Sequence, residues 1–209
     1  MTPGIDATCR TADEAATDAL GRRLGAVLRG GDVLGLEGPL GAGKTRLVRG
    51  IAAGLGVDPR AVSSPSFVLV QEYETAEDLV LAHVDAWRLE GADAVEALGW
   101  DELVGAPDVV VIVEWPSRIA DAMPAGAAWL EIGPAPESAE SAESTGSASP
   151  AGPGDAGDGR AARSPDPGAS APRLIRLRPA AGDAAGGVRG ARGEDLRRRV
   201  EEVLRAGSG

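Results

Sequence analysis

The residues with the clearest chemical potential are residues 38–45, which have the sequence Gly-Pro-Leu-Gly-Ala-Gly-Lys-Thr. Four of them occupy every fixed position of the pattern G-x-x-x-x-G-K-[ST], which cradles phosphate groups: Gly38, Gly43, Lys44 and Thr45. Glycines let backbone N–H groups turn toward phosphate oxygens, and a helix that begins near Lys44 adds the positive end of its dipole. We expect Lys44 to contact the β- and γ-phosphates of a nucleotide and the Thr45 hydroxyl to bind Mg²⁺.

The surroundings of this segment favour a functional match over a chance one. The short apolar run 33–36 precedes it and a helical pattern over 44–55 follows it, so the loop joins a strand to a helix, as phosphate loops do. Lys44 is also the only lysine among 21 basic residues. We expect ATP to contact the fixed positions together with their neighbours Gly41, Ala42 and Arg46.

Hydrolysis of a bound nucleotide also needs a carboxylate near the metal ion and the attacking water, usually at the end of an apolar strand. Glu114 ends the run 109–113, and Asp85 ends the run 79–84. We predict that both serve Mg²⁺ or the water, although a charged residue after a buried strand can also simply face solvent. His83, the only histidine, is more typical of a packed or capping residue than of a catalytic base.

The elements that must position these residues follow from periodicity and turn signals. A capping box, with Thr11 at the N-cap and Glu14 three residues later, predicts a helix over about 12–29. Two strands over 66–73 and 79–84 are close enough to form a hairpin, so the sheet is predicted to be mixed. Further helices are predicted over 92–104 and 193–206, and further strands over 109–113, 127–132 and 173–178. Together with the phosphate loop, this order predicts an α/β fold, a P-loop NTPase-like three-layer sandwich.

Three regions follow along the chain. Residues 11–133 are predicted to form the ATPase core, and residues 173–206 to complete the same domain with a final strand and helix. Residues 134–172 contain mainly Pro, Ala, Gly, Ser, Glu and Asp, and no Val, Ile, Leu or aromatic residue. Such a segment has too little apolar surface to offset the entropy of ordering, so we expect a disordered low-complexity insertion.

Composition limits the classes of partner. The net charge of −11 and the pI near 4.6 disfavour tight direct binding to nucleic acid, which needs Lys and Arg to displace counterions. The single cysteine, Cys9, cannot form an internal disulfide. Residues 1–10 lack the pattern of a signal peptide, and no apolar run is long enough to cross a bilayer, so we expect a cytoplasmic protein that does not enter membranes.

Four segments in this order resemble the TsaE family, the small ATPases of bacterial tRNA threonylcarbamoyladenosine (t6A) synthesis: GPLGAGKT, SSPSFVLVQEY, HVDAWRL and VIVEWP. The resemblance implies ATP and Mg²⁺ as cofactors, with hydrolysis that supports a TsaB–TsaD heterodimer. That pair modifies position 37 of tRNAs that read ANN codons, so tRNA is met only indirectly. The resemblance also implies a switch hydroxyl at Ser66, a tryptophan beside the nucleotide at Trp115, and Mg²⁺ or water carboxylates at Asp85 and Glu114.

Three other classes of protein share part of this pattern. A regulatory GTPase would need an N-K-x-D signature, and the chain contains no Asn. A small-molecule kinase with a P-loop is the main alternative, since Arg88 or Arg118 could act from a lid, but no lid-sized ordered insertion is visible. A nucleotide-binding adaptor without hydrolysis would not require the intact set of phosphate and metal ligands that the sequence contains.

Overall fold

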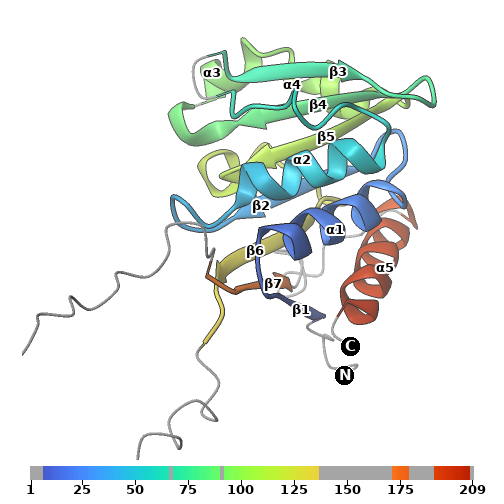
Figure 1. Cartoon of the computed structure of the whole chain (residues 1–209). Coiled ribbons are helices and arrows are strands. Elements are labelled where there is room, and N and C mark those ends of the chain that lie inside the picture. The colour runs from blue at the N-terminus through green and yellow to red at the C-terminus, as the bar shows by residue number, and fades with distance from the viewer. Residues whose placement is uncertain (1–6, 66–67, 90–91, 137–170, 179–190, 208–209) are drawn as a thin grey trace, which may run out of the picture.

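The chain forms one mixed β-sheet with helices on both faces (Figure 1). The computed structural model describes residues 7–65, 68–89, 92–136, 171–178 and 191–207. Its elements, in chain order, are β1 (Thr8–Thr11), α1 (Glu14–Gly25), β2 (Val33–Glu37), α2 (Lys44–Gly54), β3 (Val70–Glu74), β4 (Val80–Asp85), the 3₁₀ helix η1 (Ala86–Arg88), α3 (Ala92–Glu96), α4 (Trp100–Gly105), β5 (Val109–Glu114), the 3₁₀ helix η2 (Pro116–Ile119), β6 (Ala128–Pro134), β7 (Arg173–Leu177) and α5 (Ala191–Ala206).

The sheet has the strand order β1-β7-β6-β2-β5-β4-β3. Its four central strands, β6, β2, β5 and β4, run parallel, and the outer strands pair antiparallel. The β3–β4 hairpin confirms the predicted mixed sheet. Because the parallel strands end at the same edge, Glu114 of β5 lies in register with both Leu36 of β2 and Asp85 of β4. The loop after β2 therefore starts beside two carboxylates.

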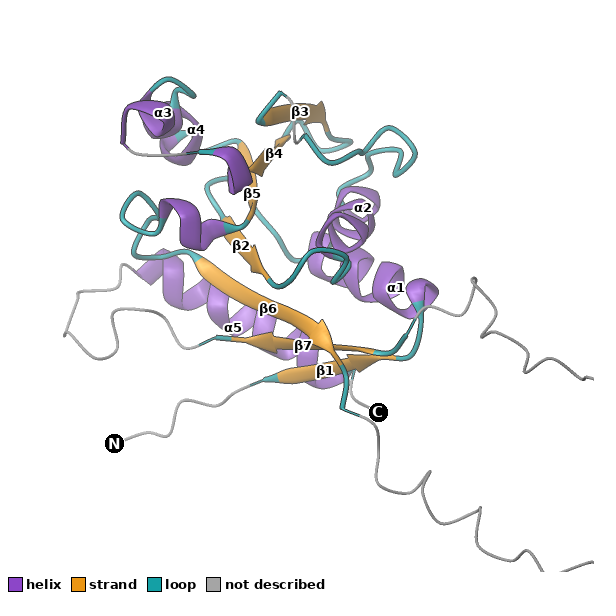
Figure 2. Cartoon of the chain, turned by 90° about the vertical axis from the view of Figure 1, so that its left-hand side faces the viewer, coloured by secondary structure: helices purple, strands orange, loops and turns teal. Residues whose placement is uncertain are grey.

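Two layers of helices cover the sheet, which makes the predicted three-layer sandwich (Figure 2). Helices α1, α2 and α5 lie on one face, and α3, α4 and η2 lie on the other. The central strand β5 shows the division: Val110 and Ile112 join the core under α1 and α2, whereas Val111 and Val113 join the opposite core. A strand buried on both faces needs this uninterrupted apolar sequence.

Helices α1 and α2 pack backbone against backbone through glycines. A Cβ atom at Gly21 would lie 2.7 Å from the Cα of Gly50, and one at Gly54 would lie 2.3 Å from the carbonyl oxygen of Arg22. Real side chains do not approach backbone atoms so closely, so these positions require glycine. The close contact fixes α1 alongside the helix that starts at the phosphate loop.

Helix α5 is tied to the start of β2 by a buried ion pair. The guanidinium of Arg199 donates to both carboxylate oxygens of Asp32 at 2.9 and 3.0 Å, and also bonds to the Val27 carbonyl. Both side chains are at most 7% exposed. Asp32 also accepts from the backbone N–H of Arg29 at 2.7 Å. The C-terminal helix is therefore fixed to the centre of the sheet.

The structure corrects several predicted boundaries. The N-cap of α1 is Asp13, whose side chain accepts from the N–H of Ala16 at 2.7 Å, and not Thr11, which belongs to the unpredicted edge strand β1. The four residues Thr-Cys-Arg-Thr are too few for a clear alternating pattern, which explains why β1 was not predicted. The helix predicted over 92–104 is interrupted before α4 by Gly99, whose φ of 66° is left-handed. The first hairpin strand starts at Val70 rather than residue 66.

The low-complexity insertion predicted over 134–172 lies mostly outside the described residues, since 137–170 are not described. Its two ends are described and they meet. Pro134 pairs with Arg173 in the β6–β7 ladder, and the N–H of Ala135 donates to the carbonyl of Pro172 at 2.9 Å.

Candidate functional site

The loop between β2 and α2 has the backbone that the glycine pattern predicts. Gly38 and Gly43 have φ values of 149° and 99°, a region that other residues rarely adopt. Gly43 is the N-cap residue of α2, and no side chain caps that helix end. The first amides of an α-helix have no partner within the helix, so an uncapped end beside a glycine loop suits an anionic group.

Lys44 is folded back over this loop and is 5% exposed. Its ammonium group donates to the carbonyls of Gly38 at 2.7 Å and Pro39 at 3.0 Å, and lies 3.4 Å from the ring centroid of Trp115. Burial lowers the pKa of Lys44, and the nearby carboxylates of Glu114, Glu37 and Asp85 act in the opposite direction. The ammonium is thus held at the loop by neutral acceptors and an aromatic face, partners that a phosphate group could displace.

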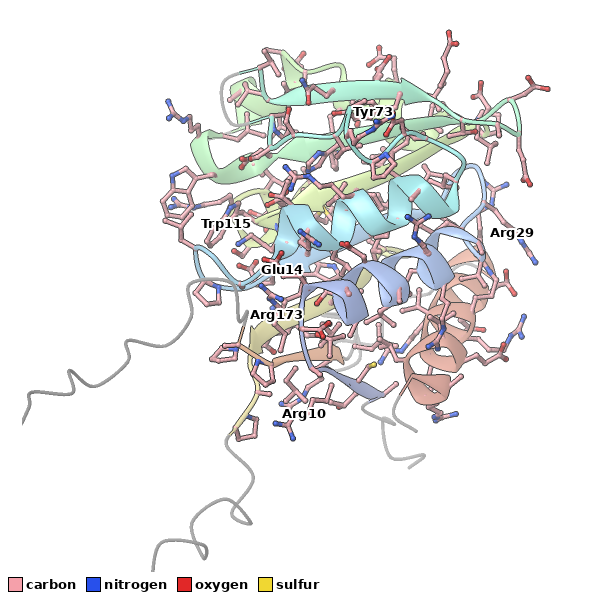
Figure 3. The ribbon with its side chains drawn as sticks, viewed as in Figure 1. Arg10, Glu14, Arg29, Tyr73, Trp115 and Arg173 are labelled. Carbon is pink, nitrogen blue, oxygen red and sulfur yellow. The ribbon has the colours of Figure 1, made fainter. Side chains whose placement is uncertain are left out.

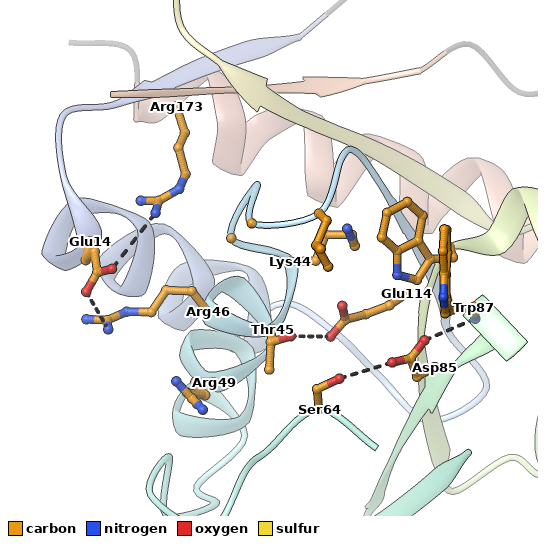
Figure 4. A pocket seen from close by; sticks show the side chains of 14 residues that line it. Glu14, Lys44, Thr45, Arg46, Arg49, Ser64, Asp85, Trp87, Glu114 and Arg173 are labelled. Carbon is orange, nitrogen blue, oxygen red and sulfur yellow. Dashed lines mark hydrogen bonds and ion pairs between the residues drawn. The ribbon is translucent and has the colours of Figure 1, made fainter. Parts of the chain in front are cut away.

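Thr45 connects the loop to the carboxylate at the end of β5. Its hydroxyl donates to Oε1 of Glu114 at 2.8 Å (Figure 4). The neighbouring carboxylate of Asp85 accepts from the Ser64 hydroxyl at 3.0 Å and from the N–H of Trp87 at 3.0 Å. Both carboxylates are almost fully buried. The sequence therefore placed the two acids correctly at one sheet edge, and the structure gives them different neighbours.

The oxygen ligands available at this edge suit a hard cation that arrives with phosphate. Within the described residues, no group of three or more His, Cys, Asp or Glu side chains could hold a metal ion by itself. Mg²⁺ is typically bound by one or two carboxylates, a hydroxyl, water and substrate phosphates rather than by a protein cage. Thr45 and Glu114, with Asp85 adjacent, fit that kind of partial site.

Two tryptophans form the wall beyond Lys44. The rings of Trp87 and Trp115 have centroids 4.6 Å apart, and the guanidinium of Arg118 lies 4.5 Å from the centre of the Trp87 ring. Trp115 has a φ of 62°, which is rare for a residue with a side chain. Strained backbone of this kind is concentrated at functional sites. Trp115 thus lies beside the phosphate loop, and its predicted place beside a nucleotide stays a prediction.

The opposite wall comes from α1, α2 and β7. Arg46 pairs with Asp18 at 2.6 Å and with Glu14 at 2.8 Å, and its hydrogen bonds to Asp18 raise the pKa of Arg46. Arg173 donates from Nε to the Ala42 carbonyl at 3.0 Å. Glu14, Trp115 and Arg173 lie on the same side of the molecule, near the N-terminal ends of α1 and α2 (Figure 3).

These walls enclose a pocket of about 520 Å³. Its lining brings together residues from the loop, both carboxylate strands and the last strand: Glu14, Leu40, Gly41, Gly43, Lys44, Thr45, Arg46, Arg49, Ser64, Asp85, Trp87, Glu114, Trp115 and Arg173. All the predicted site residues that are described lie in or next to this pocket, and Gly38 and Ala42 take part through the Lys44 and Arg173 contacts. Ser66 lies outside the described residues.

Comparison with known proteins identifies the family of this chain. The family model described as "Threonylcarbamoyl adenosine biosynthesis protein TsaE" matches residues 11–142, which is most of the chain. This chain belongs to the TsaE family. The resemblance seen in the four sequence motifs is therefore confirmed, and the TsaE match covers the phosphate loop and both carboxylates.

Individual relatives carry the same family name. The chain is 50% identical over 98 residues to the tRNA threonylcarbamoyladenosine biosynthesis protein TsaE of Streptomyces coelicolor, an alignment that covers 46% of this chain and 64% of that protein. It is 42% identical over 115 residues to the TsaE of Bacillus subtilis, covering 55% and 70%. The crystal structure of Bacillus subtilis YdiB is similar in fold, with a TM-score of 0.57, 25% identity and 95% of each chain covered. The alignment with the Streptomyces protein spans slightly less than two thirds of its length.

Two residues of the candidate site, Arg173 and Ser64, were not predicted from the sequence. Arg173 is more than 120 positions from the loop it contacts, and it reaches the loop because β7 pairs with β6. Ser64 belongs to the motif SSPSFVLVQEY, in which the resemblance implies a switch hydroxyl at Ser66, but the contact of Ser64 with Asp85 depends on how the chain returns to β4. No local pattern marks either residue.

None of the helices in the described ranges combines the length and hydropathy that a membrane-spanning segment requires.

Proposed function

We propose that this TsaE-family chain binds Mg–ATP in the pocket around Lys44 and hydrolyses it. The observation that carries the proposal is the 2.8 Å hydrogen bond between Thr45 and Glu114, because it joins a phosphate-loop hydroxyl to the carboxylate of a central strand. That pairing is the arrangement P-loop enzymes use to hold a metal ion beside the terminal phosphates. The names of the relatives, which concern t6A biosynthesis, support a role in that process.

Each residue of the site has its own role in this proposal. The uncapped amides of α2 and the Lys44 ammonium bind phosphate oxygens, and Thr45 with Glu114 holds the metal ion. When it is bound, Mg²⁺ supplies positive charge that stabilises the phosphate oxygens. Asp85, fixed by the Ser64 hydroxyl and the Trp87 N–H, is assigned to the attacking water. The aromatic face of Trp115 keeps water from one side of Lys44.

We further propose that hydrolysis supports a TsaB–TsaD heterodimer in forming t6A at position 37 of tRNAs that read ANN codons. The mouth of the pocket is apolar and solvent-exposed, since Leu40 is 92% exposed and Trp87 is 47% exposed. Exposed apolar residues around a catalytic pocket are typical of a surface that a partner covers. A partner seated there would exclude water and fix Ser64 against Asp85, which an open site does less well. The net charge of −11 favours contact with tRNA through that partner.

The test is steady-state phosphate release with and without the TsaB–TsaD pair from the same organism, together with tRNA modification by the reconstituted set. We expect slow turnover alone and faster turnover with the pair. Lys44→Ala should abolish Mg–ATP binding in calorimetry, because the chain has no second lysine to replace it. Near-normal affinity in that variant would overturn the phosphate-loop assignment. If the pair neither binds nor changes turnover, and modification proceeds without this chain, the assignment of a partner is wrong.

A further inference from the structure

His83 lies within β4, two residues before Asp85, and its side chain is fully buried. Its Nε2 atom is 2.9 Å from Oε1 of Glu114. That same oxygen accepts the hydroxyl of Thr45 at 2.8 Å. A continuous chain of hydrogen bonds therefore runs from the sheet interior, through the carboxylate, to the phosphate loop. The sequence indicated a packed histidine, and the structure shows that it is packed against the site.

The direction of this bond follows from the groups involved. An ionised carboxylate can only accept, so Nε2 must donate and must carry the ring proton. Nδ1 of the neutral ring is then an acceptor. Among the buried side-chain nitrogen and oxygen atoms of the described residues, Nδ1 is the one that has no hydrogen-bond partner. Burying such an atom without a partner costs stability. An apolar side chain would avoid this cost, so the contribution of the imidazole is its bond to Glu114.

We propose that His83 is a positioning residue for Glu114. In its neutral Nε2–H tautomer it holds Oε1 beside Thr45, and Oε2 is the oxygen that we assign to the metal ion. The catalytic consequence rests on the proposed ATPase function, but the hydrogen bond itself does not. The role resembles that of the outer groups that fix the orientation of metal ligands, whose loss typically lowers affinity or activity about 10- to 100-fold.

The first experiment uses the protein without nucleotide. Because the chain has one histidine, the imidazole ¹⁵N NMR spectrum reports His83 alone. We expect the pattern of a single neutral tautomer with the proton on Nε2. Glu114→Ala should reduce the population of that tautomer, whereas Glu114→Gln, whose amide oxygen still accepts, should keep it. A proton on Nδ1, a mixture in the unmodified protein, or no change in Glu114→Ala would overturn the proposal whether or not the protein hydrolyses ATP.

The second experiment compares two substitutions of His83 in steady-state ATP hydrolysis. His83→Leu keeps an apolar volume without a donor, and we expect kcat to fall about 10- to 100-fold with little change in KM for ATP. His83→Gln places an amide donor near the position of Nε2 and should restore most of kcat. The Leu variant should have an unchanged or higher melting temperature, because the unpaired Nδ1 is removed. Unchanged kcat in His83→Leu, equal losses in both variants, or loss of kcat that parallels loss of stability would contradict a positioning role.

Discussion

At the scale of single residues, the two carboxylates at the end of β4 and β5 are distinguished by the hydroxyl that each accepts. Glu114 accepts from Thr45 of the phosphate loop, whereas Asp85 accepts from Ser64 of the segment that leads to β3. They are register partners on adjacent parallel strands, so the difference between them lies in their neighbours and not in their position in the sheet.

This difference leads to a kinetic prediction. Glu114→Ala and Asp85→Ala should each lower the rate of ATP hydrolysis at least about tenfold while the fold survives. Glu114→Ala should also raise the Mg²⁺ concentration needed for half-maximal rate, because Glu114 is bonded to the Thr45 hydroxyl that we assign to the metal ion. Magnesium titrations of phosphate release, with circular dichroism as the control for folding, measure both effects. Normal turnover in both variants would contradict the assigned roles.

The residues that the sequence predicted share one property, which is that their signals are local. Gly43, Lys44 and Thr45 are consecutive, and Glu114 directly follows its apolar strand. Arg173 and His83 could not be assigned roles in the same way. Arg173 reaches the loop through strand pairing, and the role of His83 appears only when β4 and β5 are placed side by side.

At the scale of elements, the glycine contact between α1 and α2 gives a sharp stability test. Gly50→Ala would put a Cβ atom 2.7 Å from the Asp18 carbonyl oxygen, and we expect it to destabilise the protein by about 1–3 kcal/mol. Gly105→Ala is the matched control, because a Cβ atom at that helical position meets nothing within 4 Å. Urea unfolding of both variants measures the difference between their free energies of unfolding. Equal stabilities would mean that the helices separate without cost.

The ends of the β6–β7 connection predict that the intervening sequence can be replaced. Because the N–H of Ala135 already donates to the carbonyl of Pro172, a short Gly-containing turn should close the hairpin in place of residues 136–171. The replaced sequence holds no large aliphatic or aromatic residue. We expect the melting temperature and the affinity for Mg–ATP to stay nearly unchanged, as measured by calorimetry. A large fall in melting temperature would show that the segment contributes to packing.

The prediction of elements from the sequence succeeded where apolar runs were long. The strand Val109–Glu114 and the helix Lys44–Gly54 agree closely with their predicted ranges. The strand Thr8–Thr11 was missed, because it is short and becomes a strand through pairing with β7 at the edge of the sheet. Helix 92–104 was predicted as continuous because its apolar spacing carries no sign of the left-handed Gly99.

At the scale of the whole molecule, the Asp32–Arg199 pair joins the last helix to the first central strand. Removing Asp32 leaves the buried guanidinium of Arg199 with its more exposed partner Asp195 and the Val27 carbonyl. Asp32→Ala should therefore destabilise the protein, by less than the about 3–5 kcal/mol of a buried charge that has lost all compensation. Asp58→Ala is the control. Asp58 pairs with Arg60 at the surface, where solvent screens the interaction, and its loss should leave the melting temperature unchanged. Similar unfolding midpoints for the two variants would contradict an anchoring role for α5.

Chemical labelling of the Lys44 amine can probe the pocket without any substrate. Apart from the amino terminus, Lys44 is the only primary amine in the chain, so an amine-acylating reagent can modify one side chain. Lys44 is 5% exposed and lies against Trp115, and we expect acylation to be much slower in the folded protein than in urea. Burial lowers the pKa of Lys44, which increases the reactive neutral amine, so slow labelling would report access and not protonation.

Mass spectrometry of the labelled peptide then follows the opening of the site in time. Trp115→Ala, which removes the aromatic cover, should accelerate acylation of Lys44, and Mg–ATP should slow it in the unmodified protein. Rapid labelling of the folded chain would show that Lys44 leaves its two carbonyl partners often. Because Lys44 is the only lysine in the chain, acylation of a side-chain amine reports on the phosphate loop alone.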